Sequence, residues 1–193
     1  FEVKKDEKTI SPDDHWNKKI KADYRAKDDL KIKEKDVKAL RELGLTAVHI
    51  VPEEGIFKGK SDLVILDNDF TSYKKDVAQI IEFKATGWSD RSYPNSLLGV
   101  IAVIRQTLLD ANWYQKSTQI IEKYPEQNTL VPFHPSLSQL ADFQLNRKPM
   151  LFMTKEEHGA LRALRIADEF NLAPWLLGSG YEYRRLNEIV ELN

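Results

Sequence analysis

The chain contains four histidines, and their spacing decides which metal chemistry the sequence can support. They stand at His15, His49, His134 and His158. No two form a His-x-His pair or lie on adjacent turns of one expected helix, whereas a zinc site needs three or four convergent ligands. We therefore predict no complete histidine-based metal site and no cofactor held by this chain alone. His49 lies inside an apolar run and has two interpretations, a hydrogen-bonded histidine of the core or pocket and a single metal ligand.

An acidic residue and a Glu-x-Lys string could support a different chemistry. Asp62 begins one expected strand, and Glu82-Phe83-Lys84 ends another. Because side chains alternate along a strand, Glu82 and Lys84 share one face. Carboxylates there could hold Mg²⁺ while the lysine polarises a water or a phosphate, an arrangement that resembles the PD-(D/E)xK nucleases. The basic groove that DNA binding by a nuclease needs is not evident in the composition, which has 29 basic and 30 acidic side chains.

Two glycine-rich strings are similar to catalytic motifs but depart from them. Residues 55–61, Gly-Ile-Phe-Lys-Gly-Lys-Ser, have three residues between the glycines instead of four and precede a strand instead of a helix, so we interpret them as a turn and not as a P-loop. Gly178-Ser179-Gly180 lacks the glycine spacing of a serine nucleophile elbow. The chain has no cysteine, which excludes disulfides, thiolate metal sites and a cysteine nucleophile.

The elements that position these residues alternate between strands and helices. The expected strands are 46–51, 63–66, 78–83, 150–153 and 173–177. The expected helices are 33–43, a long one from about Asn95, 154–170 and 181–192. Gly44 suits the end of the first helix, and strands separated by helices through short loops predict parallel pairing with crossovers. The predicted fold class is α/β.

The first 43 residues differ in composition from the rest. Residues 1–41 carry 13 Lys or Arg and 10 Asp or Glu, which predicts a charged, solvated, helical lead-in with a short helix from Pro12. Residues 44–193 form the expected α/β segment. Within it, Thr154 and Glu157 have capping-box spacing, which predicts that their side chains satisfy free N–H groups at a helix start.

The long helix carries apolar residues at three- and four-residue steps, which predicts one stripe against the sheet. The stripe comprises Leu98, Ile101, Ala102, Leu108, Leu109 and Trp113. Arg105 lies beside it and has two interpretations, a substrate-binding residue and one half of an ion pair.

Three stretches of the chain resemble one family. Residues 44–61 and 93–114 look like the imidazolonepropionase-related branch of the amidohydrolases, and residues 148–183 resemble the βα repeats of that group. The resemblance implies parallel βα units of a (β/α)₈ TIM-type barrel. It also implies a metal-activated water that attacks a C–N bond of an amide or cyclic amide, with the ligands at the C-terminal ends of the strands.

The chain departs from that family where the metal ligands belong. It has no counterpart of the family's His-x-His pair, later histidines or final aspartate, and Lys155 is the nearest counterpart of its bridging lysine. A complete barrel also needs about 250 residues, against 193 here. We expect a partial or degenerate domain that is inactive alone, with zinc or another divalent metal in a complete family member.

Two further alternatives follow for its role. The segment is expected to be joined to the remainder of a larger hydrolase or to a second hydrolase domain. The alternatives to a hydrolase segment are a non-catalytic structural or interaction domain of a larger hydrolase and the Mg²⁺-dependent nuclease. No run reaches the roughly 18 to 20 apolar residues of a membrane span, and the near-zero net charge gives no general affinity for nucleic acid. Because the sequence opens on Phe instead of Met, we interpret it as a processed or excised piece, which leaves a secreted or cell-envelope location open.

Overall fold

The structure is a computed structural model that describes residues 2–3, 15–69, 71–86, 92–126 and 131–192. The strands are β1 (Glu2–Val3), β2 (Ala47–Pro52), β3 (Phe57–Lys60), β4 (Asp62–Ile65), β5 (Ser72–Lys74), β6 (Gln79–Glu82), β7 (Pro149–Met153) and β8 (Ala173–Leu177). The helices are α1 (Glu34–Glu42), α2 (Leu97–Lys123), α3 (Pro135–Leu145), α4 (Glu157–Glu169) and α5 (Leu186–Glu191), with 3-10 turns at Ala26–Asp29 and Glu182–Arg185. The helix expected from Pro12 lies outside the described residues.

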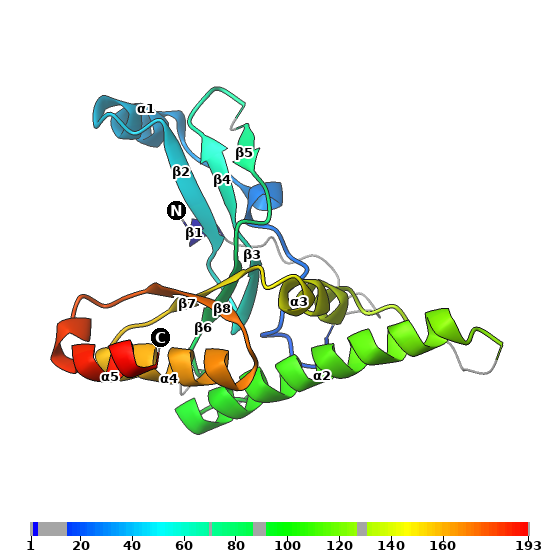
Figure 1. The fold of residues 1–193 in the computed structure, drawn as a ribbon. Coiled ribbons are helices and arrows are strands. Elements are labelled where there is room, and N and C mark those ends of the chain that lie inside the picture. The colour runs from blue at the N-terminus through cyan, green and yellow to red at the C-terminus, as the bar shows by residue number, and fades with distance from the viewer. Residues whose placement is uncertain (1, 4–14, 70, 87–91, 127–130, 193) are drawn as a thin grey trace.

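The strands form two four-stranded sheets, and each sheet contains both parallel and antiparallel pairs. One has the order β1-β2-β4-β5 and the other β3-β6-β7-β8. In Figure 1, β2, β4 and β5 rise as an arm above the layer that contains β6, β7 and β8. Strands β6, β7 and β8 are parallel neighbours, whereas β2–β4, β4–β5 and β3–β6 are antiparallel.

The parallel part confirms the α/β class and has the strand–helix alternation of part of a (β/α)₈ barrel. Helices α2 and α3 lie between β6 and β7 in the chain, and α4 lies between β7 and β8. Parallel pairing was predicted for strands separated by helices, and β2 to β6 are not of that kind. The connections between those strands contain no helix, and such short links join antiparallel neighbours, whereas parallel neighbours need a crossover of a dozen or more residues.

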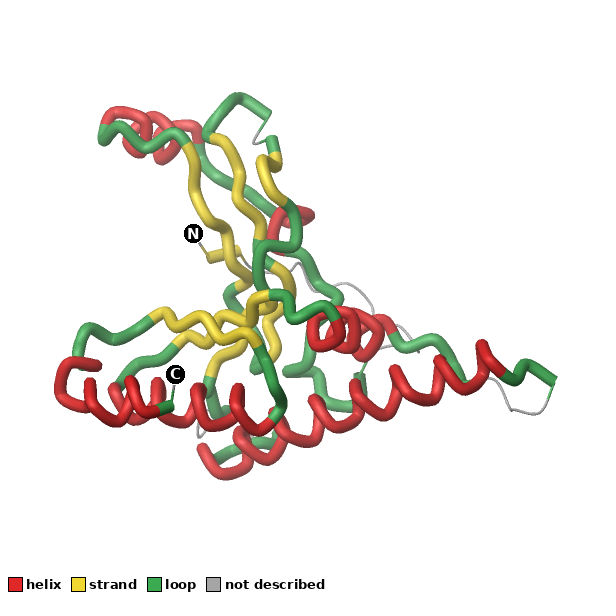
Figure 2. The backbone as a smooth tube through the Cα atoms, in the orientation of Figure 1, coloured by secondary structure: helices red, strands yellow, loops and turns green. Residues whose placement is uncertain are grey.

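The helices cover one side of the parallel strands. Figure 2 shows α2, α4 and α5 on the same side of β6, β7 and β8. The main core lies between them, where Ile81 of β6 and Phe152 of β7 join buried residues of α2, α3 and α4. Alternation turns Ile80 and Leu151 to the opposite face, where they form a second, smaller cluster with Val51 of β2. Among the described residues, no helix is long and apolar enough to cross a membrane.

The long helix is confirmed, but the expected stripe is only partly its buried face. Leu108 is fully buried, yet Leu98 is 77% exposed and Leu109 and Trp113 are exposed as well. Ile104, which was not in the stripe, is buried instead. The helix has apolar residues on more than one face, and only contact with β6, β7 and α3 decides which of them is covered.

Part of the lead-in belongs to the core, so the expectation that it is solvated was wrong for this part. Ile20 and Ala26 are buried, and Ile20 forms a bridge with Phe57 of β3. Gly59 has φ +120°, and a Cβ there would lie 2.4 Å from the carbonyl oxygen of Tyr24. The glycine therefore lets the lead-in pass directly against β3. The expected boundary at residue 43 stays a prediction.

The start of α4 differs from the expected capping box. Glu156 is the N-cap residue and makes no side-chain capping bond. The Thr154 hydroxyl donates instead to the carbonyl oxygen of Leu177 at 3.2 Å. The capping prediction was wrong because Thr154 ties the end of β7 to the end of β8, and this leaves its hydroxyl turned away from the helix.

Candidate functional site

A cavity lies where the parallel strands end. Its volume is about 260 Å³, and its wall combines residues that end or follow β2, β6, β7 and β8 with one residue of β3. The lining residues are Glu53, Lys58, Glu82, Lys84, Met153, Thr154, Lys155, Leu177 and Gly178. The C-terminal ends of parallel strands are where α/β barrels carry their active sites, because loops there can vary while the strands stay fixed.

A buried carboxylate shared by two lysines lies in the wall of this cavity. Glu82 is 6% exposed and Lys58 is 1% exposed. The Lys58 Nζ lies 2.7 Å from Glu82 Oε2, and the Lys155 Nζ lies 2.9 Å from Glu82 Oε1. The Lys58 Nζ also lies 3.4 Å from Met153 Sδ. Each oxygen of the buried carboxylate therefore has its own ammonium partner.

The two lysines keep Glu82 charged inside the fold. Burial alone would raise the pKa of the Glu82 carboxyl, because a charged group loses its water. Hydrogen bonds from Lys58 and Lys155 outweigh that effect and hold the pKa below its ordinary value. Glu82 is thus an ionised hydrogen-bond acceptor at neutral pH.

The rim of the cavity is fixed by hydrogen bonds around the end of β8. The backbone N–H of Thr154 donates to the carbonyl oxygen of Leu177 at 3.0 Å. Beyond Gly178, the carboxylate of Glu182 accepts the backbone N–H of Ser179 at 2.6 Å and that of Gly180 at 2.9 Å. The Ser179 hydroxyl also donates to Glu182 at 3.0 Å. This serine is engaged in holding the loop.

The structure brings Glu82, Lys84 and Lys155 to one cavity, but it does not bring Asp62 there. Pairing of β3 with β6 places Lys60 opposite Gln79, at the far end of β6 from Glu82. The three residue steps along β6 from Gln79 to Glu82 alone span about 10 Å, at the usual rise of roughly 3.3 Å per residue. The nuclease hypothesis requires the carboxylates of Asp62 and Glu82 to converge on one metal ion, and in the structure they do not.

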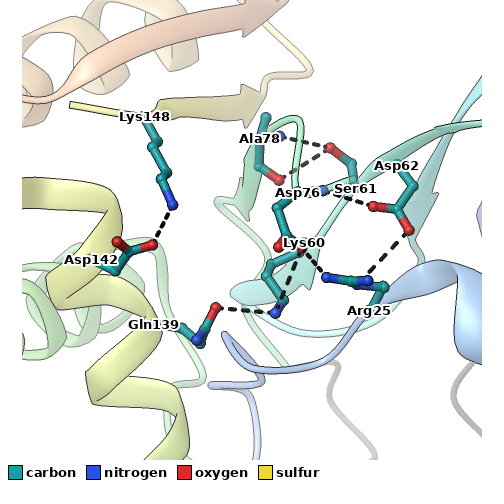
Figure 3. Close-up of polar contacts among 9 residues, drawn as sticks. All are labelled: Arg25, Lys60, Ser61, Asp62, Asp76, Ala78, Gln139, Asp142 and Lys148. Atoms are coloured by element: carbon teal, nitrogen blue, oxygen red, sulfur yellow. Dashed lines mark hydrogen bonds and ion pairs between the residues drawn. The ribbon is translucent and has the colours of Figure 1, made fainter. Parts of the chain in front are cut away.

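Asp62 belongs instead to a polar cluster that binds the lead-in to the sheets (Figure 3). The Asp62 Oδ1 accepts the backbone N–H of Asp76 at 2.8 Å, and Arg25 Nε lies 3.9 Å from Asp62 Oδ2. Arg25 also donates to Asp76 at 2.6 Å, and Lys60 donates to Gln139 of α3 at 3.0 Å. The side chain of Asp62 is fully buried, so this cluster has a structural role.

The remaining candidates lie away from the cavity. His49 is on β2 opposite Leu63 of β4, and burial lowers the pKa of its imidazole. Arg105 of α2 makes an ion pair with Glu169 of α4, with 2.7 Å between Nε and Oε2, so its ion-pair interpretation is confirmed. His158 is exposed near the start of α4.

The donor set of the cavity does not fit a divalent metal ion. Its two carboxylates are outnumbered by three ammonium groups, and both oxygens of Glu82 already accept from lysines. Across the described part of the chain, no group of three or more His, Cys, Asp or Glu is placed to hold a metal. The histidines that come closest are His15 and His134, whose ring centroids are 5.6 Å apart.

Sequence reasoning missed Lys58. Residues 55–61 were interpreted as a turn, whereas they contain β3. Alternation of apolar and polar residues cannot be recognised in that strand, because two of its four residues are lysines and one is a glycine. The nearest available signal was the acidic end of the neighbouring strand, since a buried lysine needs a carboxylate partner.

Comparison with known proteins supports the fold alone. No family model and no curated protein matches the chain. Among solved structures, an amidohydrolase from Thermotoga maritima MSB8 superposes with a TM-score of 0.73 at 17% sequence identity, over 86% of this chain and 45% of that chain. The chain thus has an amidohydrolase-like fold and spans less than half the length of the enzyme that it resembles.

Proposed function

We propose that this chain is a segment of an amidohydrolase-like hydrolase of the imidazolonepropionase-related branch, which acts on C–N bonds of amides or cyclic amides. The observation that carries the proposal is the cavity at the C-terminal ends of β6, β7 and β8, in a fold shared with an amidohydrolase. Glu82, Lys58 and Lys155 supply it with fixed charges. Such charges orient a polar substrate and stabilise charge that develops during acyl transfer.

The segment is proposed to be inactive alone. The catalytic metal would be held by histidines outside these 193 residues, because the cavity offers too few free oxygen or nitrogen donors. The β8 edge of the second face of the parallel sheet supports this, since Trp175 is 45% and Leu177 is 50% exposed there. A further part of the hydrolase would cover both side chains.

Assays of the whole open reading frame that contains residues 1–193 test the proposal. The full polypeptide is expected to hydrolyse members of a panel of amides and cyclic amides in the presence of zinc, and the 193-residue chain is not. Glu82→Gln in the full polypeptide should lower kcat/KM by about 100-fold, while Glu122→Gln on exposed α2 serves as the matched control.

Metal analysis of the 193-residue chain after dialysis gives an independent result. We expect zinc well below one equivalent. Stoichiometric zinc that disappears on replacement of His49 would contradict the proposal, and so would a full polypeptide with no C–N hydrolase activity.

A non-catalytic structural module is the second candidate, favoured by the same exposed Trp175 and Leu177. A full polypeptide whose hydrolysis is unchanged by Glu82→Gln would favour that role for this segment.

A further inference from the structure

Two histidine rings meet between the lead-in and the start of α3. His15 of the lead-in is 6% exposed, and its ring centroid lies 5.6 Å from that of His134, with the two ring planes at 71°. His134 is the N-cap residue of α3. Neither ring lines the cavity at the ends of the parallel strands, so the contact is separate from the proposed hydrolase site.

Both rings use the same nitrogen as a hydrogen-bond acceptor. The Nδ1 of His15 accepts the backbone N–H of Asn17 at 3.1 Å, and the Nδ1 of His134 accepts the backbone N–H of Leu137 at 3.4 Å. An imidazole that accepts at Nδ1 is neutral and carries its proton on Nε2. A further proton on each ring would go to Nδ1 and would remove these bonds, because an imidazolium only donates.

The surroundings of the pair also oppose proton uptake. Burial is the largest cause that lowers the pKa of His15, and the nearby charge of His134 adds to it. A positive charge on His134 would lie at the N-terminus of α3, where the helix dipole favours negative charge. Protonation of both rings would place two like charges in rings 5.6 Å apart. The packed arrangement therefore belongs to the neutral rings.

The other ionisable groups around the pair come from α2 and from the lead-in. The carboxylate of Asp110 on α2 favours the charged form of His15. Tyr114 of α2 accepts the backbone N–H of His134 through its hydroxyl oxygen at 3.4 Å. Asp23 of the lead-in hydrogen-bonds to a hydroxyl in the first turn of α3. Asp110 thus acts against the burial of His15, and it does not reverse the lowered pKa.

The histidine contact holds a segment that supports the cavity. The backbone N–H of Ile56 donates to the carbonyl oxygen of Lys19 at 2.8 Å, and that of Lys21 donates to the carbonyl oxygen of Phe57 at 2.8 Å. These bonds join the lead-in to β3, the strand that carries Lys58. Release of the histidine contact would loosen the lead-in along the strand that supplies the buried lysine of the cavity.

We propose that His15 and His134 form a pH-sensitive latch, which holds the lead-in against α2 and α3 while both rings are neutral and releases it when they take up protons at Nδ1. The latch is independent of the proposed function. Because the folded pKa of His15 is depressed, the stability that the latch contributes is fully present above the unfolded pKa of about 6.5 and is lost as pH falls from there toward the folded pKa.

Hydrogen exchange of the 193-residue chain at about pH 7.5 and about pH 5.5 tests the latch, since these values lie on either side of the usual histidine pKa. Each rate is compared with the intrinsic amide rate at the same pH, because exchange itself slows in acid. Protection of the amides of Asn17, Lys19 and Lys21 should fall by roughly tenfold at the lower pH, while protection within α4 should not change.

Asparagine variants separate the latch from general effects of acid. Asn offers a neutral oxygen to a backbone N–H two or three residues on, so His15→Asn/His134→Asn should keep both backbone bonds and lose the acid response. His158→Asn is the matched control, because His158 is exposed near the start of α4, and it should respond to acid as the wild type does. Ring titration by nuclear magnetic resonance should show that His134→Asn moves the pKa of His15 upward, since a neighbouring charge is removed.

Several results would overturn the latch. These are protection of the lead-in amides that does not change with pH, an acid response of the double variant equal to that of the wild type, and loss of the response in His158→Asn. A pKa of His15 that His134→Asn leaves unchanged would also overturn it. This single variant keeps the test decisive if the double variant does not fold, because Asn is itself a favourable N-cap residue.

Discussion

Glu82 retains its negative charge inside the fold because Lys58 and Lys155 each bind one of its oxygens. A buried ion pair of this kind adds little net stability, since desolvation of the two charges offsets their attraction. Its value lies in fixing charges at the floor of a cavity. Removal of one partner has a large effect, because the other is left buried without compensation.

Replacement of Lys58 measures that effect. Lys58→Met should lower the free energy of unfolding by about 3 kcal/mol, since Glu82 then keeps only the exposed Lys155 as a partner. The double variant Lys58→Met/Glu82→Leu should recover most of the loss, because two apolar side chains of similar volume replace the pair. Urea denaturation of the three proteins gives both differences.

An exposed ion pair and the pH dependence provide the controls. Lys148→Met breaks the half-exposed pair with Asp142 and should lower the free energy of unfolding by less than about 1 kcal/mol.

The folded pKa of Glu82 is depressed, so the contribution of its carboxylate to stability is present above the unfolded pKa of about 4.3 and is lost as pH falls through the folded pKa. A double variant as unstable as Lys58→Met, with the same acid dependence as the wild type, would show that Glu82 is not the affected partner.

The parts of the site that the sequence predicted are those with local signals. Glu82 and Lys84 were named because alternation along a strand places both on one face, and Lys155 was named from the family resemblance. Lys58 and the rim could not be predicted, because they depend on which strand pairs with β6 and on the loop that Glu182 holds. Pairing between strands is a long-range contact that leaves little trace in local composition.

Among the elements, the sequence predicted α1, α2 and α4, missed α3 (Pro135–Leu145) and placed one helix over 181–192, where the structure has a 3-10 turn followed by α5. It also failed to orient α2. Helix α2 was expected and is present, yet its buried face includes Val103, Ile104 and Thr107, and only Leu108 of the expected stripe is fully buried with them. Thr107 satisfies its hydroxyl within the helix by donating to the Val103 carbonyl oxygen at 2.8 Å, which allows a polar residue to face the core.

Truncations along α2 test this orientation. Ile104→Ala should lower the free energy of unfolding by about 3 kcal/mol, because it leaves a cavity among residues of α2, α3 and the sheet. Leu109→Ala, on the exposed face, should change it by less than about 0.5 kcal/mol. Half-buried Ile101→Ala should fall between them.

Equal losses for Ile104→Ala and Leu109→Ala, measured by thermal and urea unfolding, would show that the helix packs in another rotation. Arg105→Ala provides an electrostatic comparison, since its ion pair with Glu169 is half exposed and should contribute less than about 1 kcal/mol.

In the molecule as a whole, the two faces of the parallel sheet are covered to different extents. Helices α2, α3 and α4 cover the face that carries Ile81 and Phe152. The opposite face carries Ile80 and Leu151 beside Val51 of β2, and at its β8 edge it exposes Trp175 and Leu177. An apolar patch next to an edge strand is a frequent site of association.

This face should make the 193-residue chain associate with itself when it is alone in solution. Sedimentation equilibrium should show an average mass that rises with concentration. Trp175→Glu should restore the mass of a monomer and leave the chain folded, because the Trp175 side chain is 45% exposed and is not part of the buried core. Leu109→Glu is the matched control, since Leu109 is comparably exposed but lies on α2. Association unaffected by Trp175→Glu, or abolished equally by Leu109→Glu, would place the interacting surface elsewhere and would count against a further part of a hydrolase covering β8.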